Sequence, residues 1–393
     1  MLAVGRADAI RVAAAAAAST AAFPQAAFAT DSTRLMGADA ALAGRAGAVP
    51  LDTATGSFMP ADLEKYLAVA LEKRGGATPR VFFAGETHTH ELHHALQLSM
   101  IRAVDKLDAA PTIIGLEMCW RQHQPALDAF VFDDESRGGG SVETLASRTG
   151  WPRTWGYPID LYTDVLRYAR QKQLRLVGLN TPYPVIQAVS RRGLSGLPGE
   201  LQPYLPDVDL DNREHKRRFA EAIGGTVDAR SNAILLPERS KDSAAWQESK
   251  PPLRPLEVEY MYQAMSLWDE YMASSIAGYV SAQPKERAGV GGSRSTGTER
   301  MVVLAGTNHV RGRVGMPDRF TRRTQLPTFT MIPLAVPWPA VGKPPVAATP
   351  KLPPSEADWV VYTRPEGKRW RSPDGSHDRA VLPRKLIAEA VFL

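Results

Sequence analysis

The stretch from 80 to 94 constrains the fold of this chain more than any other. Its residues Val81-Phe-Phe-Ala84 carry no charge and begin with a β-branched side chain, as buried strands often do. Gly85 ends this run, and a dense group of ionisable residues follows at once: Glu86, His88, His90, Glu91, His93 and His94. Open α/β sheets bind their ligands beyond the carboxyl ends of parallel strands. We therefore expect the functional site at the end of this strand.

The same alternation of short apolar runs and longer amphipathic segments continues along the chain. Besides the strand at 80–86, strands are predicted over 112–118, 174–180, 301–305 and 329–334, the last weakened by Pro333. One helix is predicted within 51–72, after Asp62, and others over 89–107, 124–132, 158–172, 185–192, 212–223 and 256–280. Such alternation favours an α/β fold with a mainly parallel central sheet and helices on both faces. Its site should lie at the carboxyl edge of the strands.

We divide the chain into three parts. Residues 1–50 are expected to be a targeting segment and disordered leader, 51–335 the α/β domain with a Gly/Ser/Arg-rich loop insertion at 284–300, and 336–393 a Pro-rich C-terminal extension. Arg6 and Arg11 precede an alanine run, and Ala27-Phe28-Ala29 is an A-x-A type cleavage site. The alternative for this segment is a disordered Ala-rich tail.

The leader and the loop insertion suggest a location. They favour a chloroplast protein, in the thylakoid lumen, with a bacterial periplasmic or secreted protein as the alternative. No other run approaches the ~20 apolar residues of a spanning helix, so we expect no stable membrane insertion.

Composition excludes several classes of function. The single cysteine, Cys119, rules out an intrachain disulfide and any multi-cysteine zinc or iron–sulfur site within one chain. The net charge of +5 arises from 47 basic and 42 acidic residues without a long basic run, so nucleic-acid binding is not expected. No phosphate-loop or Gly-x-Gly-x-x-Gly motif opens the first helix, which disfavours nucleotide binding. A metal would need His, carboxylate, Tyr or Met ligands.

Polar residues stand at the ends of four predicted strands, and two of these ends share the form Gly-x-x-His. The residues are Glu86 and His88, Glu117, Asn180, and Asn308 with His309. Two imidazoles and two carboxylates at one edge would form a metal site or an acid–base pair. We take Glu86 and Glu117 as candidate catalytic residues, and His88, His309 and Glu86 as candidate metal ligands. The histidines are alternatively turn residues, and Asn180 a capping residue.

Aromatic residues and further histidines surround these strand ends. Trp151, Trp155, Tyr157 and Tyr162 form either a packed corner or a wall for a flat ligand. His90 and His94 share a helix face at i,i+4, which suits either a metal or a solvated face, and His123 could approach from the loop after the second strand.

Six blocks of sequence, in order between residues 81 and 334, carry a resemblance. They are Phe82-Phe-Ala-Gly-Glu-Thr-His88, Gly115-Leu-Glu-Met118, Gly150-Trp-Pro-x-x-Trp-Gly-Tyr157, Gly178-Leu-Asn-Thr-Pro182, Gln263-Ala-Met-Ser-Leu-Trp-Asp-Glu-Tyr-Met-Ala273 and Leu304-Ala-Gly-Thr-Asn-His309. Together they resemble the ChaN-like haem-binding uptake proteins, which are similar to the Tiki metalloproteases and to erythromycin-esterase-like proteins.

The resemblance implies an α/β fold and haem binding linked to iron handling. For the Tiki branch it implies metal-dependent peptide cleavage through the paired Gly-x-x-His motifs. Carried over to this chain, the matching residues are Glu86, His88, Glu117 and His309. The chain departs from the family in two respects. It lacks an N-terminal cysteine, which rules out lipidation of such a cysteine, and the loop at 284–300 and the tail beyond 334 look like additions.

Two functions follow from these expectations. The leading one is a haem-binding protein, with haem at the carboxyl edge beside the aromatic segment and a homodimer as a further expectation. Its cofactor-binding candidates are His88, Trp155, Tyr157, Asn180 and His309, and Arg121 or Arg153 could pair with the propionates. The alternative is a Tiki-like hydrolase that holds a divalent metal ion between His88, His309 and a glutamate. A catalytically silent scaffold is a third.

Overall fold

The structure is a computed structural model, and it describes residues 78–107, 110–134, 140–236, 254–281, 299–336 and 352–363, with the backbone alone at 48–52 and 57–58. The described chain falls into two compact units. One contains residues 181–271, and the other contains the described residues up to Asn180 and from Met272 on. Each unit is described by itself.

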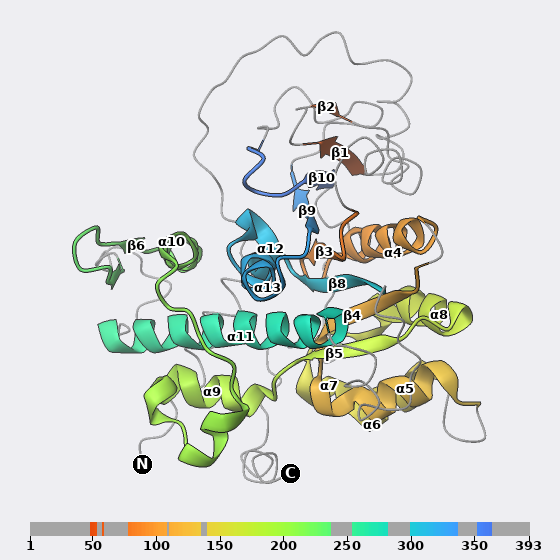
Figure 1. The fold of residues 1–393 in the computed structure, drawn as a ribbon, viewed down its shortest axis with the longest axis horizontal. Helices are drawn as coiled ribbons and strands as arrows, with labels where there is room; N and C mark the ends of the chain where they lie inside the picture. The colour runs from red at the N-terminus through yellow and green to blue at the C-terminus, as the bar shows by residue number, and fades with distance from the viewer. Residues whose placement is uncertain are drawn as a thin grey trace, which may run out of the picture. The chain divides into compact units, whose positions relative to one another are not determined.

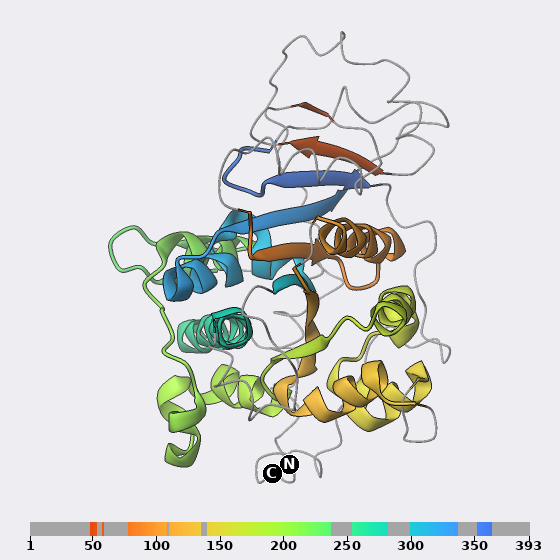
Figure 2. The ribbon, with the colours of Figure 1, turned by 45° about the vertical axis from the view of Figure 1, so that its right-hand side comes forward.

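The larger unit is built on an eight-stranded sheet with the strand order β2-β1-β10-β9-β3-β8-β4-β5 (Figures 1 and 2). The strands are β1 (Ala48–Asp52), β2 (Ser57–Phe58), β3 (Val81–Glu86), β4 (Thr112–Trp120), β5 (Leu176–Asn180), β8 (Arg300–Gly306), β9 (Thr328–Ala335) and β10 (Trp359–Thr363). All neighbours from β10 to β5 pair in parallel, whereas β1 is antiparallel to β10 and β2 to β1. The predicted α/β fold with a mainly parallel sheet is confirmed.

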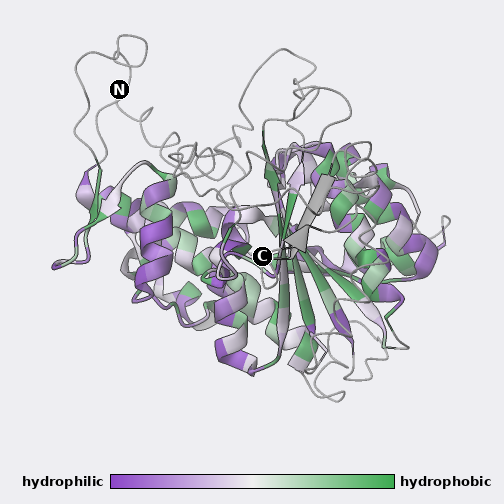
Figure 3. Ribbon diagram, turned by 90° about the horizontal axis from the view of Figure 1, so that it is seen from above, coloured by the Kyte–Doolittle hydropathy of each residue, from purple (hydrophilic) through white to green (hydrophobic). Residues whose placement is uncertain are grey.

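Helices cover both faces of this sheet because successive strand residues point to opposite sides. Phe82 of β3 belongs to the same buried cluster as Ile101 and Val104 of α4 (Glu91–Asp105). Its neighbour Phe83 instead contacts Phe320 of α13 (Met316–Thr324), with ring centroids 6.4 Å apart. The strands accordingly carry mostly hydrophobic residues, as Figure 3 shows. Strands buried on both faces explain the uninterrupted apolar runs of the sequence.

The remaining helices of the larger unit lie between the strands in sequence. They include the 3-10 turns η1 (Arg121–His123), η3 (Ile159–Tyr162) and η7 (Arg311–Arg313), and the helices α5 (Gln124–Phe132), α6 (Val142–Thr149), α7 (Trp151–Thr154), α8 (Thr163–Lys172) and α12 (Thr307–Val310). The helix predicted over 158–172 thus begins as a 3-10 turn. None of the helices in the described ranges has both the length and the apolar composition that a membrane-spanning helix requires.

The smaller unit consists of helices and a short hairpin. It contains α9 (Tyr183–Arg192), α10 (Arg213–Ala222), β6 (Thr226–Val227), β7 (Ile234–Leu235) and most of α11 (Pro255–Ser281), which continues into the larger unit at Met272. Phe219 of α10 and Tyr262 of α11 pack together in its core, with ring centroids 5.5 Å apart. The helices predicted over 185–192, 212–223 and 256–280 are present.

Two expectations at the ends of the domain are wrong. Strand β10 lies within 336–393, where we expected an extension outside the domain, yet it pairs with β9 over its full length. Residues 48–50 of the expected leader belong to β1, which continues to Asp52, and 57–58 form β2. The helix expected after Asp62, the leader up to residue 47 and the loop at 284–298 lie outside the described residues.

Pro333 is accommodated in β9 by a change of partner. β9 pairs with β3 only from Thr328 to Met331, and with β10 from Met331 onward. Pro333 therefore lies where β9 has a hydrogen-bonding partner on one side, so its missing N–H does not interrupt a ladder on both sides.

Candidate functional site

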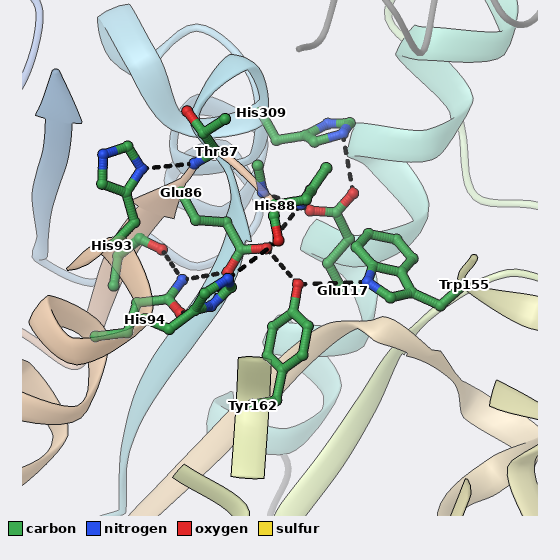
Figure 4. A network of polar contacts seen from close by, with 12 residues as sticks. Glu86, Thr87, His88, His93, His94, Glu117, Trp155, Tyr162 and His309 are labelled. Carbon is green, nitrogen blue, oxygen red and sulfur yellow. Dashed lines mark hydrogen bonds and ion pairs between the residues drawn. The ribbon is translucent and has the colours of Figure 1, made fainter. Parts of the chain in front are cut away.

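Three adjacent parallel strands bring their carboxyl ends together at the site (Figure 4). Glu86, at the end of β3, lies opposite Gly306, at the end of β8. Glu117 of β4 reaches across the same edge, and its Oε2 accepts the Gly306 N–H at 2.6 Å. The strand ends that carry the predicted residues are thus joined by backbone pairing and by one side-chain hydrogen bond.

An irregularity in β4 shapes this edge. The pairing of β4 with β5 is in register up to Leu116 and resumes, shifted, at Trp120. The Trp120 carbonyl approaches Gly178 of β5 so closely that a Cβ there would have no room. Within the shifted stretch, Asn180 donates its side-chain amide to the Glu117 carbonyl at 2.9 Å. The buried Asn180 therefore fixes the backbone that carries Glu117.

Glu86 is the centre of the polar network and is almost fully buried, at 2 % exposure. Its Oε1 accepts hydrogen bonds from His88 Nδ1 at 2.7 Å and from the Tyr162 hydroxyl at 2.6 Å. Its Oε2 accepts from Gln97 Nε2 at 2.7 Å and lies 3.3 Å from His94 Nδ1. Four donors around one carboxylate offset the cost of burying its charge.

His94 carries the positive charge that balances Glu86. Its Nδ1 faces the Glu86 carboxylate and the Gln97 side-chain oxygen, and its Nε2 faces the His88 carbonyl at 3.1 Å. Because both ring nitrogens face acceptors, both carry protons. Burial would lower the pKa of His94, but the charge of Glu86 outweighs it and raises that pKa. Burial would likewise raise the pKa of Glu86, yet His94 and His88 hold it well below the ordinary value.

The ring of His93, in contrast to that of His94, is neutral. Its Nδ1 accepts the Thr87 N–H at 2.8 Å, so the proton lies on Nε2, which donates to the Thr363 hydroxyl of β10 at 3.1 Å. Burial, and then the charges of His90 and His94, lower its pKa well below the ordinary value. The ring of His90 stacks on it, with centroids 3.8 Å apart. His93 thus connects the site loop to the strand that the sequence did not predict.

A partly exposed aromatic group lies next to this network. The His88 ring has its centroid 4.8 Å from those of both Trp155 and Tyr157, and the latter two are 5.5 Å apart. The His88 side chain is 11 % exposed, and Trp155 and Tyr157 are half-buried. We call these three residues the aromatic shelf.

The two alternatives predicted for the aromatic segment, a packed corner and a wall for a flat ligand, apply to different residues. Trp151 and Tyr162 are buried, and their ring centroids lie 5.4 Å apart in the core cluster. They form the packed corner. Trp155 and Tyr157 remain partly accessible and belong to the aromatic shelf.

A second carboxylate–imidazole pair lies beside the first. Glu117 Oε1 is 3.3 Å from His309 Nε2 and makes no hydrogen bond within the described part of the chain. A Cβ on Gly306 would lie 3.2 Å from His88 Nε2 and 3.6 Å from Glu117 Oε2. The lack of a side chain at Gly306 therefore lets the His88 ring and the Glu117 carboxylate approach the backbone closely.

The metal ligands predicted from sequence are not gathered. Within the described ranges, no group of three or more His, Cys, Asp or Glu side chains could hold a metal ion. The physical reason is that the set is divided, because Glu86 engages His88 and His94 whereas His309 faces Glu117. The prediction of one metal site formed by His88, His309 and Glu86 therefore finds no support in this structure.

Other predicted residues have mainly structural contacts. His123 Nδ1 accepts the Trp120 N–H at 3.1 Å, and burial lowers its pKa to about 4. Arg121 donates to Ser274 and Ser275 of α11, both at 2.6 Å. The residue that sequence reasoning missed is Gln97, which bonds Glu86 and the Ala84 carbonyl. Its spacing of three residues from His94 on α4 was the available signal.

Comparison with known proteins identifies the family. The sequence model described as haem-binding uptake, Tiki superfamily, ChaN matches residues 76–320, more than half of the chain. The chain belongs to this family. The match confirms the resemblance carried by the six sequence blocks, and Glu86 and the aromatic shelf lie within the matched range. A comparison with curated proteins gives no match.

A solved structure supports the fold. The chain is similar to a structure of ChaN of Campylobacter jejuni described as showing cofacial haem binding. The TM-score is 0.53 and the identity 14 %, over 81 % of this chain and 97 % of that one. The type III effector HopBA1 is more distant, with a TM-score of 0.38 at 9 % identity, over 77 % of this chain and 94 % of the effector. The likeness to ChaN, at 14 % identity, establishes the fold and nothing further.

The residues of the aromatic shelf fit the group that the ChaN family binds. Histidine and tyrosine are both axial ligands of haem iron, and here they lie side by side at a partly exposed edge. Because His88 Nδ1 donates to Glu86, Nε2 is the ring nitrogen left for a ligand, and it lies close to Gly306. When one nitrogen of an imidazole binds a metal, the other nitrogen commonly donates to a carboxylate, as His88 Nδ1 does here.

Proposed function

We propose that this protein binds haem on the aromatic shelf and takes part in haem or iron handling. The observation that carries the proposal is the position of His88, which is held by the buried Glu86 and lies 4.8 Å from each of the rings of Trp155 and Tyr157. A planar porphyrin gains from flat aromatic surface, and its iron gains from an imidazole or a phenolate.

The charge of the haem requires a partner as well. Of the two arginines considered from sequence, Arg121 is engaged by two serines, whereas Arg153 is exposed on α7, within the same segment as Trp155 and Tyr157. We propose Arg153 as a partner for a propionate. We further propose an exported or organellar location, as the leader-like composition of residues 1–29 suggests.

The experiment is a titration of the full chain with haemin, followed by the Soret band. Saturable binding is expected, with a band position that changes in Tyr157→Phe if the phenolate is the ligand and in His88→Ala if the imidazole is. Tyr168→Phe is the matched control, because Tyr168 lies on α8 and bonds Asp105 of α4 at 3.0 Å, outside the shelf. A wild-type protein that shows no saturable Soret change would refute the proposal.

A further inference from the structure

Tyr162 joins two members of the aromatic shelf without belonging to it. Its side chain is buried, at 1 % exposure, and its ring packs against Trp151 and His94. Its hydroxyl lies 2.6 Å from Glu86 Oε1 and 3.3 Å from Trp155 Nε1. The hydroxyl is therefore in contact with the carboxylate that orients His88 and with the indole of the shelf (Figure 4).

The chemistry of the three groups fixes the direction of each hydrogen bond. An indole N–H only donates and an ionised carboxylate only accepts, so the Tyr162 hydroxyl accepts from Trp155 and donates to Glu86. The same hydroxyl thus serves as the acceptor for Trp155 and as the donor for Glu86. Burial and the charge of Glu86 raise the pKa of Tyr162, which keeps its proton in place.

The two hydrogen bonds of the Tyr162 hydroxyl each fix one part of the aromatic shelf. The indole ring of Trp155 is half-buried and belongs to the residue that follows the short helix α7, so the bond to Tyr162 fixes its orientation. Glu86 Oε1 is shared by Tyr162 and His88, so the hydroxyl also fixes the oxygen to which His88 is anchored. A neutral phenylalanine ring could fill the same volume but could perform neither task.

We propose that Tyr162 is a positioning residue for haem binding. It couples the orientation of Trp155 to that of His88 through Glu86, and it touches no ligand itself. This inference rests on the proposed function and names a residue that neither the strand-end motifs nor the shelf contains.

The test compares Tyr162→Phe with Tyr168→Phe in haemin titrations of the full chain. Both substitutions remove one hydroxyl that donates to a carboxylate and keep the ring. Tyr162→Phe is expected to raise the Kd for haemin about tenfold, which corresponds to ~1.4 kcal/mol, whereas Tyr168→Phe leaves it unchanged. Combining Tyr162→Phe with Trp155→Phe should weaken binding by less than the product of the two single effects, because both act on one hydrogen bond.

A second readout is independent of haem. In the haem-free protein the indole N–H resonance of Trp155, identified by its absence in Trp155→Phe, should move in Tyr162→Phe and stay in place in Tyr168→Phe. If Tyr162→Phe does not fold, hydrogen exchange of this indole in the wild type takes its place. Slow exchange is expected for a donor bonded to Tyr162, and exchange as fast as that of a free indole would overturn the proposal.

The outcomes separate this inference from the proposed function. A wild type that binds haemin and a Tyr162→Phe variant that binds it equally well would overturn the positioning role alone. A wild type without saturable haemin binding would overturn both.

Discussion

The substitution Glu86→Gln tests whether one buried carboxylate holds the site together. The glutamine has nearly the same shape but no charge, and its amide nitrogen must replace one of two acceptor oxygens. Each of these oxygens faces two donors, His88 and Tyr162 on one side and Gln97 and His94 on the other. Either orientation of the amide therefore places a donor against donors.

The magnitude has two contributions. Leaving about two buried donors without an acceptor costs roughly 2 kcal/mol at any pH. His94 also loses its counter-ion and must stay neutral in the folded variant, which costs about 1.4 kcal/mol for each pH unit below its ordinary pKa of 6.5. At pH 5.5 the expected loss of unfolding free energy is roughly 3–4 kcal/mol, as for other broken buried ion pairs. At pH 8 it falls to about 2 kcal/mol.

The assay must report on the larger unit alone, because a chain of two compact units need not unfold in one step. Hydrogen–deuterium exchange of peptides that cover β3 and α4, measured across a urea series at pH 5.5 and pH 8, meets this requirement. Asp105→Asn is the control, since Asp105 lies on α4 and bonds a tyrosine hydroxyl at the partly exposed end of the helix. A loss below 1 kcal/mol in Glu86→Gln at pH 5.5, or an equal loss at both pH values, would refute the reasoning.

Two further predictions concern neighbouring residues. Gly306→Ala should keep the fold, because the φ of −54° at Gly306 suits alanine. The new Cβ would, however, lie 3.0 Å from His88 Cε1. We therefore expect the free energy of unfolding to fall by about 1–3 kcal/mol and haemin binding to weaken. Gly278→Ala on α11 is the control, because the space around Gly278 is open, and it should stabilise the protein. Thermal melting and haemin titration of both variants provide the test. A Gly306→Ala variant as stable as Gly278→Ala, with unchanged haemin binding, would contradict the packing argument. The raised pKa of His94 means that its stabilisation is complete below pH 6.5 and is lost as the pH rises through the folded value. The difference in unfolding free energy between wild type and His94→Gln should accordingly shrink above pH 6.5, and a difference that grows with pH would contradict the assigned charge.

The central strands of the fold could be predicted because each signal is local. The runs at β3, β4, β5, β8 and β9 are largely apolar, and those at β3, β5 and β8 end at a glycine or a polar residue. Strand β10 was missed although Trp359-Val-Val-Tyr-Thr363 has a strand-like composition. Its Pro-rich surroundings suggested an extension, and its place in the sheet depends on the partner β9, which the local sequence does not specify.

The site could be predicted in part for the same reason. Parallel strands place Glu86, His88 and Glu117 at one edge, and this followed from the sequence alone. The hydrogen bonds that hold Glu86 could not be foreseen, because they depend on where Gln97 and Tyr162 direct their polar atoms. Side-chain direction across elements is a property of the tertiary structure, which the spacing along the chain does not encode.

The location of iron in crystals grown with haemin tests the central claim most directly. We expect one anomalous difference peak for iron beside His88 and Tyr157, with the porphyrin against Trp155 at the carboxyl edge of the sheet. An iron peak elsewhere on the chain, or crystals that remain free of haem from a saturating solution, would contradict the account.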